Sequence, residues 1–190
     1  MVMNVIDAIY GRRAVRTYAP RPVDEGTIRR LLRAATHAPS AMNAQPWLFA
    51  VVQNRAQLAR YSDLAKLLML ELASADLKAR RYDALLRETS FNVFYDAGTL
   101  VAIGVAEPGP YADADCWLAA EALMLAAHDA GLGTCPIGFA VPLLNDADVK
   151  KELGFPESAL IVSPIIVGYP STTVSEVPRR EPRIVSWSKE

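Results

Sequence analysis

The spacing of apolar residues predicts two helices near the start of the chain. Val5, Ile6 and Ile9 recur at helical spacing, and Gly11 ends this short helix. Asp24 predicts the start of a second helix, because an aspartate side chain accepts hydrogen bonds from the free backbone amides of a first helical turn. The apolar face of this second helix comprises Ile28, Leu31, Leu32 and Ala35.

Unbroken apolar runs predict buried strands. Such runs cover residues 47–52, 99–105 and 160–169, and residues 134–139 predict a short strand or a loop. Pro164 lies inside the third run. It predicts that this strand is irregular or lies at an edge, because proline has no N–H to donate to a neighbouring strand.

Longer helices are predicted between and after these runs. Residues 58–87 contain no proline and predict one or two helices, and residues 146–153 predict a small one. Residues 117–130 are apolar on nearly every face, which is typical of a central helix or of a helix at a subunit interface, and Gly131 ends them. The inward face of the first helical region is expected to comprise Leu64, Leu67, Leu68 and Leu72. Strands separated by helices indicate an α/β or α+β fold.

Composition is that of a single-domain globular protein. The chain has 190 residues, of which 52% are hydrophobic and 22% charged, so it is too apolar to be disordered. Its net charge of −1 argues against a general nucleic-acid binder.

Cys116 and Cys135 lie in apolar stretches, which argues against a disulfide framework and predicts a reducing compartment. Neither a signal peptide nor an uncharged apolar stretch of membrane-spanning length is recognisable, so we expect a cytoplasmic protein with no membrane partner.

Arginines gather in two distant segments of this nearly neutral chain. Three lie in residues 12–16 and three in residues 179–183. Arg12 and Arg16 fall on one side of either a helix or a strand, because a separation of four residues fits both periods. Guanidinium groups bind phosphate through paired hydrogen bonds, so a phosphate site is one interpretation and a solvated basic turn is the other.

Two loops carry groups that suit a flat heterocycle. Residues 38–47 contain Ser40, Asn43 and Gln45, whose hydroxyl and amide groups match the polar edge of such a ring, although a simple turn before a strand explains them equally. Residues 131–138 are punctuated by glycines that let a ligand approach the backbone. They follow a helix and do not spell a dinucleotide-binding fingerprint.

Side chains alone predict no catalytic or metal site. His37 is expected at a helix end, His128 in packing and Cys135 in a small apolar role. Glu121 lies in an apolar helix and needs a partner, which we expect to be structural. The sequence has no nucleophile motif, zinc-ligand spacing or paired carboxylates, so an enzymatic reaction would depend on a bound cofactor.

Three separated segments resemble the FMN-dependent nitroreductase family. They are Arg12-Arg13-Ala14-Val15-Arg16, Ala38-Pro39-Ser40-Ala41-Met42-Asn43-Ala44-Gln45-Pro46-Trp47 and Pro178-Arg179-Arg180-Glu181-Pro182. The resemblance covers almost the whole chain, and its P-S-x-x-N-x-Q-P-W segment is the most specific part. It implies an α+β sandwich in which helices flank a central, mostly antiparallel sheet with one parallel C-terminal strand.

The resemblance also implies a homodimer. Residues 1–169 would form the FMN-binding domain, and residues 170–190 would form a C-terminal arm that is exchanged with the partner subunit. Such docking would cover Ile184, Val185 and Trp187, which are unusual in a free polar tail.

The resemblance assigns FMN-binding roles to particular residues. Arg16 would face the pyrimidine edge of the ring, and the backbone of Ile137 and Gly138 would face its N5 atom. Ala14 and Pro136 also belong to the FMN-binding set that the resemblance implies. The phosphate would be bound by Arg12 and Arg180, assisted by Arg13 or Arg179. The loop that touches the flavin of the other subunit comprises Pro39, Ser40 and Asn43, with Ala41 and Gln45 beside them.

The implied activity is NADH- or NADPH-dependent reduction of a nitroaromatic, a quinone or a similar electron-poor small molecule through flavin N5. An FMN-dependent dehydrogenase or specialised redox enzyme on the same fold, and a flavin-binding dimer without turnover, are the alternatives. Ala14 stands where the family commonly has a serine, and no acidic residue precedes Gly138. Asn92 is expected near the ribityl or dimethylbenzene side of the flavin.

Overall fold

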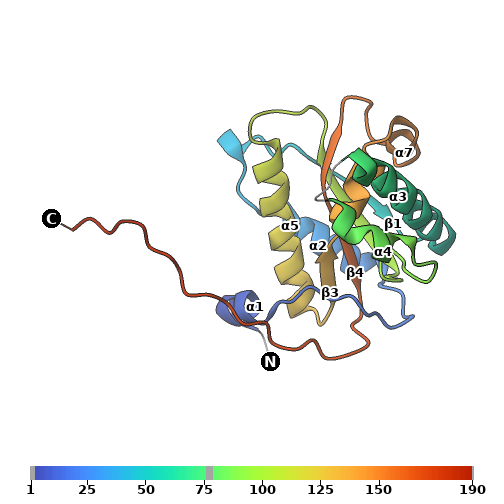
Figure 1. The fold of residues 1–190 in the computed structure, drawn as a ribbon. Coiled ribbons are helices and arrows are strands. Elements are labelled where there is room, and N and C mark those ends of the chain that lie inside the picture. The colour runs from blue at the N-terminus through green and yellow to red at the C-terminus, as the bar shows by residue number, and fades with distance from the viewer. Residues whose placement is uncertain (1–2, 76–78, 190) are drawn as a thin grey trace.

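The computed structural model describes residues 3–75 and 79–189, in which helices surround a four-stranded sheet (Figure 1). The long helices are α2 (Glu25–Ala35), α3 (Arg55–Ala75) and α5 (Ala112–Asp129). The short helices are α1 (Val5–Gly11), α4 (Asp83–Arg87), α6 (Val141–Leu144) and α7 (Ala147–Glu152). Single 3₁₀ turns are η1 (Ala41–Asn43), η2 (Ala79–Tyr82) and η3 (Gly138–Ala140).

The strands pair in the spatial order β1 (Trp47–Val52), β2 (Thr99–Val105), β4 (Leu160–Gly168) and β3 (Gly133–Pro136). All three pairings are antiparallel. The two middle strands, β2 and β4, are buried along almost their whole length, which explains why their sequences are continuously apolar instead of alternating. The predicted strands and the α+β class are confirmed.

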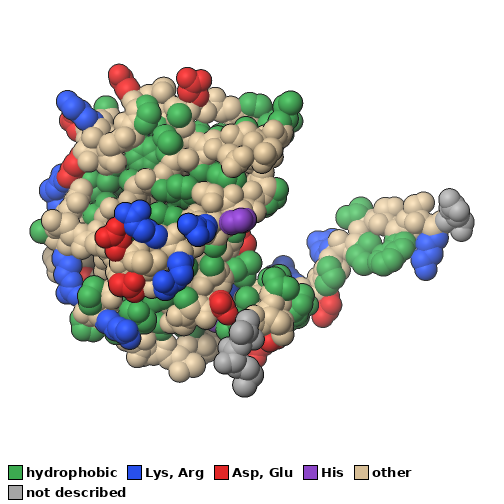
Figure 2. Space-filling view, turned by 180° about the vertical axis from the view of Figure 1, so that it is seen from behind, with side chains coloured by type: hydrophobic (Ala, Val, Ile, Leu, Met, Phe, Trp, Pro, Cys, Tyr) green, Lys and Arg blue, Asp and Glu red, His purple; other side chains and the backbone are tan. Residues whose placement is uncertain are grey.

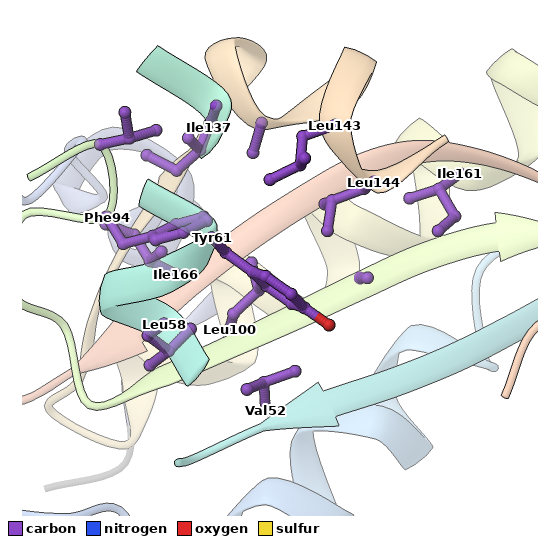
Figure 3. Close-up of a cluster of buried hydrophobic side chains, with 14 of the residues drawn as sticks. Val52, Leu58, Tyr61, Phe94, Leu100, Ile137, Leu143, Leu144, Ile161 and Ile166 are labelled. Carbon is purple, nitrogen blue, oxygen red and sulfur yellow. The ribbon is translucent and has the colours of Figure 1, made fainter. Parts of the chain in front are cut away.

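Helices cover both faces of the sheet. On one face α2 and α5 pack against a core that includes Val101 and Ile103 of β2. On the other face α3 and α6 pack against a core that includes Leu100 of the same strand. Figure 3 shows Leu58 and Tyr61 of α3 close to Leu100, with the side chains of α6 further along. Alternate residues of β2 therefore serve two separate cores.

Local signals define the helix ends as predicted. The Asp24 carboxylate accepts a 2.8 Å hydrogen bond from the Thr27 amide, and Asp146 caps α7 in the same way. Gly131, the residue after the C-cap Ala130 of α5, adopts a φ of +71°, a conformation that residues other than glycine disfavour. Helix α5 begins at Ala112, earlier than predicted.

The predicted inward face of α3 is wrong except at Leu68, which is partly buried and packs against the core. Leu64, Leu67 and Leu72 are exposed by 37%, 66% and 47%. The buried positions of this helix are Leu58, Tyr61, Ser62, Ala65 and Ala73. Helix α3 carries two apolar stripes, and the sheet and α6 pack against the one that contains Leu58, Tyr61 and Ala65.

Pro164 is not in an edge strand, because β4 lies between β2 and β3. Its carbonyl accepts a 2.9 Å hydrogen bond from the amide of Ile137, a residue beyond the end of β3. In an antiparallel strand the N–H and C=O of one residue point to the same side. The side on which Pro164 lacks an N–H is therefore the side of β3, beyond the last residue of that strand, where no regular strand pairing is lost. The predicted irregularity is confirmed, since the register shifts opposite Ile103 and Gly104.

Residues 171–189 contain no helix or strand and extend away from the body (Figure 1). The Oγ1 atoms of Thr17 and Thr172 lie 2.8 Å apart at the start of this arm. Further along, hydrophobic side chains are exposed (Figure 2), including Val185 and Trp187, at 99% and 71%. The parallel C-terminal strand is absent from the described residues, because the arm pairs with no strand of its own chain. Among the described helices, none is long and apolar enough to cross a membrane.

Candidate functional site

The first arginine cluster lies in an extended segment beside β3. The Val15 amide donates a 2.9 Å hydrogen bond to the Thr134 carbonyl, and Ala14 forms a parallel bridge with Thr134. Gly133 allows this approach, because a Cβ atom there would lie 2.6 Å from Cγ2 of Val15. The side chain of Val15 faces the interior, and alternation places Arg12, Ala14 and Arg16 on the opposite side.

A cationic cavity of about 640 Å³ lies at the Arg12 end of this segment. It is lined by Arg12, Arg13 and His128, by the backbone around Gly131, and by the first residues of the arm. The Nε atoms of both arginines are buried without a hydrogen-bond partner, although Arg12 Nε lies 3.4 Å from Glu121 Oε1. Positive charge with unused donors suits an anionic ligand group. Arg12 is thus the partner that Glu121 needs, and it belongs to this cavity.

A second cavity, of about 370 Å³, lies at the Arg16 end. Its floor includes Ile137 and Gly138, and no atom lies within 4 Å of the place where a Cβ on Gly138 would stand. Tyr82 and Phe139, whose ring centroids are 5.1 Å apart in an edge-to-face arrangement, contribute to its wall. The other lining residues are Arg16, Leu85, Val93, Tyr95, Cys135 and Pro136. An open backbone floor beside aromatic rings suits a flat ligand.

The two cavities lie next to each other along β3 and along residues 12–16. Thr134 of β3 lines the cationic cavity, and Cys135, the next residue, lines the aromatic one. The same order holds along the neighbouring segment, from Arg12 to Arg16. The arrangement suits an elongated ligand with an anionic group at one end and a flat ring at the other.

Arg16 meets Tyr95 between the aromatic cavity and a third one of about 330 Å³. Its Cζ atom lies 5.9 Å from the centre of the Tyr95 ring. Tyr95 and Asp96 have φ values of +52° and +55°, which are costly for residues other than glycine. Asn92 supports this turn, since its Oδ1 accepts a 2.8 Å hydrogen bond from the Phe94 amide and its Nδ2 donates to Asp96.

Burial raises the pKa of the Cys135 thiol, and the positive charges of Arg16 and Arg12 oppose that shift. Burial lowers the pKa of His128, and Arg12 and Arg13 lower it further. Both groups are therefore mostly neutral at pH 7. Among the described residues, no group of three or more His, Cys, Asp or Glu side chains is arranged to hold a metal ion.

The loop between α2 and β1 lies apart from both cavities. Met42, Asn43 and Gln45 all have positive φ, and Met42 is fully exposed. The Ser40 hydroxyl accepts a 3.0 Å hydrogen bond from the Gln45 amide, which stabilises the turn. The predicted site residues of this loop line neither cavity within the single chain; they are Pro39, Ser40, Ala41, Asn43 and Gln45.

The structure brings together only part of the predicted set. Arg12 and Arg13 line one cavity, while Arg16, Pro136, Ile137 and Gly138 line the other. Arg179 and Arg180 are exposed on the arm and line neither. Sequence reasoning missed Tyr95 and His128. Nothing in the sequence marks Tyr95, and only the position of His128, three residues before the glycine that ends α5, connects it with the site.

A four-stranded antiparallel sheet between helical layers, with adjoining cationic and aromatic cavities along β3, defines the chain as a small-ligand-binding α+β protein. The sequence profile of the Nitroreductase family matches residues 9–169, and the chain belongs to this family.

Known relatives agree with this membership. A protein of Archaeoglobus fulgidus described as an NADH dehydrogenase/NAD(P)H nitroreductase is 31% identical over 163 residues, 85% of this chain and 83% of that protein. The iodotyrosine deiodinase of Thermotoga neapolitana is 29% identical over 157 residues, 79% of this chain and 80% of that one. The FMN-bound nitroreductase of Bacteroides fragilis superimposes with a TM-score of 0.85 and 26% identity, covering 98% of this chain and 100% of that one.

Proposed function

We propose that this protein is an FMN-dependent NAD(P)H oxidoreductase that reduces nitroaromatic, quinone or similar electron-poor small molecules. The observation that carries the proposal is the pair of adjoining cavities along residues 12–16 and β3. FMN has a phosphate at one end and a flat ring system at the other, which matches the order of cationic and aromatic lining. The Archaeoglobus relative, described as an NADH dehydrogenase/NAD(P)H nitroreductase, supports the same electron donor, and the FMN-bound nitroreductase of Bacteroides supports the same cofactor.

The residues present fit FMN in two respects. The buried Nε atoms of Arg12 and Arg13 have no hydrogen-bond partner, so the guanidinium groups retain capacity for a phosphate. The empty space above Gly138 allows a ring to lie directly on the backbone. When bound, FMN would supply hydride transfer chemistry through its N5 atom.

The protein's own residues would bind and orient the cofactor. Arg12 and Arg13 would hold the phosphate, and Arg16 would place a positive charge beside the ring. The backbone of Ile137 and Gly138 would support the ring. In this proposal the protein provides binding, orientation and electrostatics, in agreement with the absence of a nucleophile motif in the sequence.

The proposed active form is a homodimer. The loop at residues 39–45 is exposed and structured but lines no cavity beside Arg12 or Arg16, and the arm carries unpartnered apolar side chains. A second copy of the chain would use both features, because its loop would close the aromatic cavity and its body would cover the arm. Docking of the arm would also bring Arg179 and Arg180 to a phosphate.

The purified protein tests the proposal directly. We expect it to be yellow, to bleach when NADH or NADPH is added without oxygen, and to recover its colour when a nitroaromatic or a quinone is added. A colourless protein that takes up no added FMN would overturn the proposal. Colour that no pyridine nucleotide bleaches would indicate a flavin-binding dimer without turnover instead.

A specialised redox reaction on the same fold is the second candidate. The similarity to the Thermotoga iodotyrosine deiodinase favours it, since the aromatic cavity is also suited to a phenolic ring. Bleaching by NAD(P)H that neither a nitroaromatic nor a quinone reverses would support this candidate over the first.

A further inference from the structure

His128 lies in the last turn of α5, and its ring is packed against the end of α1. A Cβ atom on Gly11 would lie 2.7 Å from Nε2 of His128, closer than real Cβ contacts, so the imidazole occupies space that only glycine leaves free. The ring is partly exposed, and it lines the cationic cavity together with Arg12 and Arg13. Packing against α1 does not require an imidazole that also lines a cationic cavity.

The imidazole has no hydrogen-bond partner in the part of the chain that the structure describes. Arg12 and Arg13 face it from the segment after α1, and Asp129 lies next to it on α5. The other residues that line the cavity carry no ionisable side chain; they are Met3, Gly11, Val15, Gly131, Leu132, Thr134 and residues 170–174. Its donor therefore remains available to a ligand.

We propose that His128 is a third phosphate-binding group of this cavity, which takes up a proton from solvent when a phosphate enters and then donates a charge-assisted hydrogen bond to it. This inference rests on the proposed function, because the phosphate in question is that of FMN. Two arginines and a titratable histidine would make the preference for FMN over riboflavin dependent on pH.

The sign of the effect follows from the neighbours of His128. In the free protein, burial and the two arginines lower its pKa, so the ring is mostly neutral at pH 7. A phosphate dianion beside the ring favours the charged form, and so does the carboxyl end of α5. Binding therefore raises the pKa, and the contribution of His128 to affinity grows as the pH falls. The phosphate itself loses a second proton with a pKa of about 6, so its own negative charge, and with it the affinity for FMN, decreases as the pH falls. A matched variant without the histidine measures this opposing effect separately.

The chain offers an internal reference, because it has two histidines. His37 is exposed at the end of α2, away from the cationic cavity. In protein labelled with ¹⁵N-histidine, we expect FMN to raise the pKa of His128 by about one pH unit or more, while the ring signals of His37 do not respond to FMN. Riboflavin, which lacks the phosphate, should leave both histidines unchanged, and inorganic phosphate at millimolar concentration should raise the pKa of His128 alone.

Binding measurements on variants complete the test. His128→Gln keeps an amide donor but cannot take up a proton. Relative to the unmutated protein, it should weaken FMN binding several-fold at pH 6 and less than twofold at pH 8.5, the scale of one charge-assisted hydrogen bond. Gly11→Ala should have the same effect by displacing the ring, and the matched control His37→Gln should have none. Riboflavin affinity should be the same in all four proteins.

Each outcome separates this inference from the proposed function. If FMN binds but the pKa of His128 does not change, or if His128→Gln loses the same factor at both pH values, the inference is wrong and the proposed function stands. If no flavin binds but inorganic phosphate raises the pKa of His128, the phosphate site stands and the FMN proposal falls. If neither FMN nor inorganic phosphate affects His128, the inference is wrong.

Discussion

The backbone amide of Ala41 donates a 3.0 Å hydrogen bond to Oδ1 of the buried Asp115. The carbonyl of the same aspartate accepts a 2.8 Å hydrogen bond from the indole of Trp47. Both ends of the loop are thus fixed to the first turn of α5. This anchoring explains how Met42, Asn43 and Gln45 hold positive φ angles that cost free energy.

Asp115→Ala should release the loop. It removes the acceptor for the Ala41 amide, so we expect the free energy of unfolding in urea to fall by about 1–3 kcal/mol. Limited proteolysis should cleave the loop faster. Asp115→Asn keeps an oxygen acceptor and should lose less, and the exposed Asp113→Ala should lose almost nothing. Equal loss in Asp113→Ala and Asp115→Ala would contradict the anchoring role.

Arg12→Ala should weaken FMN binding by about 1.5–3 kcal/mol, because a charge-assisted hydrogen bond to the phosphate is lost. Titration of flavin fluorescence measures the affinity. Riboflavin should bind equally to both proteins. Arg29→Ala is a matched control, since Arg29 is an exposed partner of Glu25 on α2. An unchanged FMN affinity in Arg12→Ala would remove Arg12 from the site.

Arg16→Gln should lower the two-electron reduction potential of the bound flavin. A fixed positive charge stabilises the reduced, negatively charged form more than the neutral oxidised form. A partly exposed charge worth about 1.4–3 kcal/mol corresponds to a shift of roughly 30–60 mV. The potential is measured against a reference dye at full flavin occupancy. Arg21→Gln provides the control, since Arg21 lies over the Tyr169 ring at 4.0 Å, and a potential equal in all three proteins would place Arg16 outside the site.

Truncation after Val174 should lower both dimer stability and flavin content. It preserves the contact between Thr17 and Thr172 but removes the exposed apolar residues Val177, Ile184, Val185 and Trp187. Light scattering and the ratio of flavin to protein absorbance measure the two effects. Val185→Ser combined with Trp187→Ser keeps the chain length and should show a milder form of both. A native protein that is monomeric by light scattering would contradict the dimer.

Cys116 should resist alkylation in the native protein. Its side chain is fully buried, and burial, with Asp113 and Asp115 nearby, raises its pKa to about 12. Because the thiolate is the nucleophile, raising the pH from 7 to 9 should hardly increase its labelling by iodoacetamide, as mass spectrometry would detect. The same reagent should label it readily in denaturant. Fast native labelling at pH 8 would show that α5 opens.

The arginine segment shows how far sequence reasoning reaches into the site. The common side of Arg12 and Arg16 follows from their separation alone, and the structure places them at the ends of two adjoining cavities. The sequence does not reveal that His128 completes the first cavity. A histidine in an apolar helix has the same local pattern whether it packs or binds, and only the crossing of α1 and α5 decides the matter.

What the sequence determined by itself is the set of features that depend on neighbours along the chain. Asp24 caps α2 and Gly131 ends α5, because the hydrogen bonds and the backbone conformation of a single turn decide where a helix begins and ends. The apolar runs at 47–52 and 99–105 form β1 and β2, because the burial of each segment depends on its own side chains.

Only the tertiary structure decided which faces and groups meet. Helix α3 has two apolar stripes, and the position of the sheet selects the one with Leu58 and Tyr61 over the one with Leu64 and Leu67. The loop at Ala41 is held by Asp115, which lies 74 residues later in the chain. Such contacts depend on the path of the whole backbone, so no local pattern contains them.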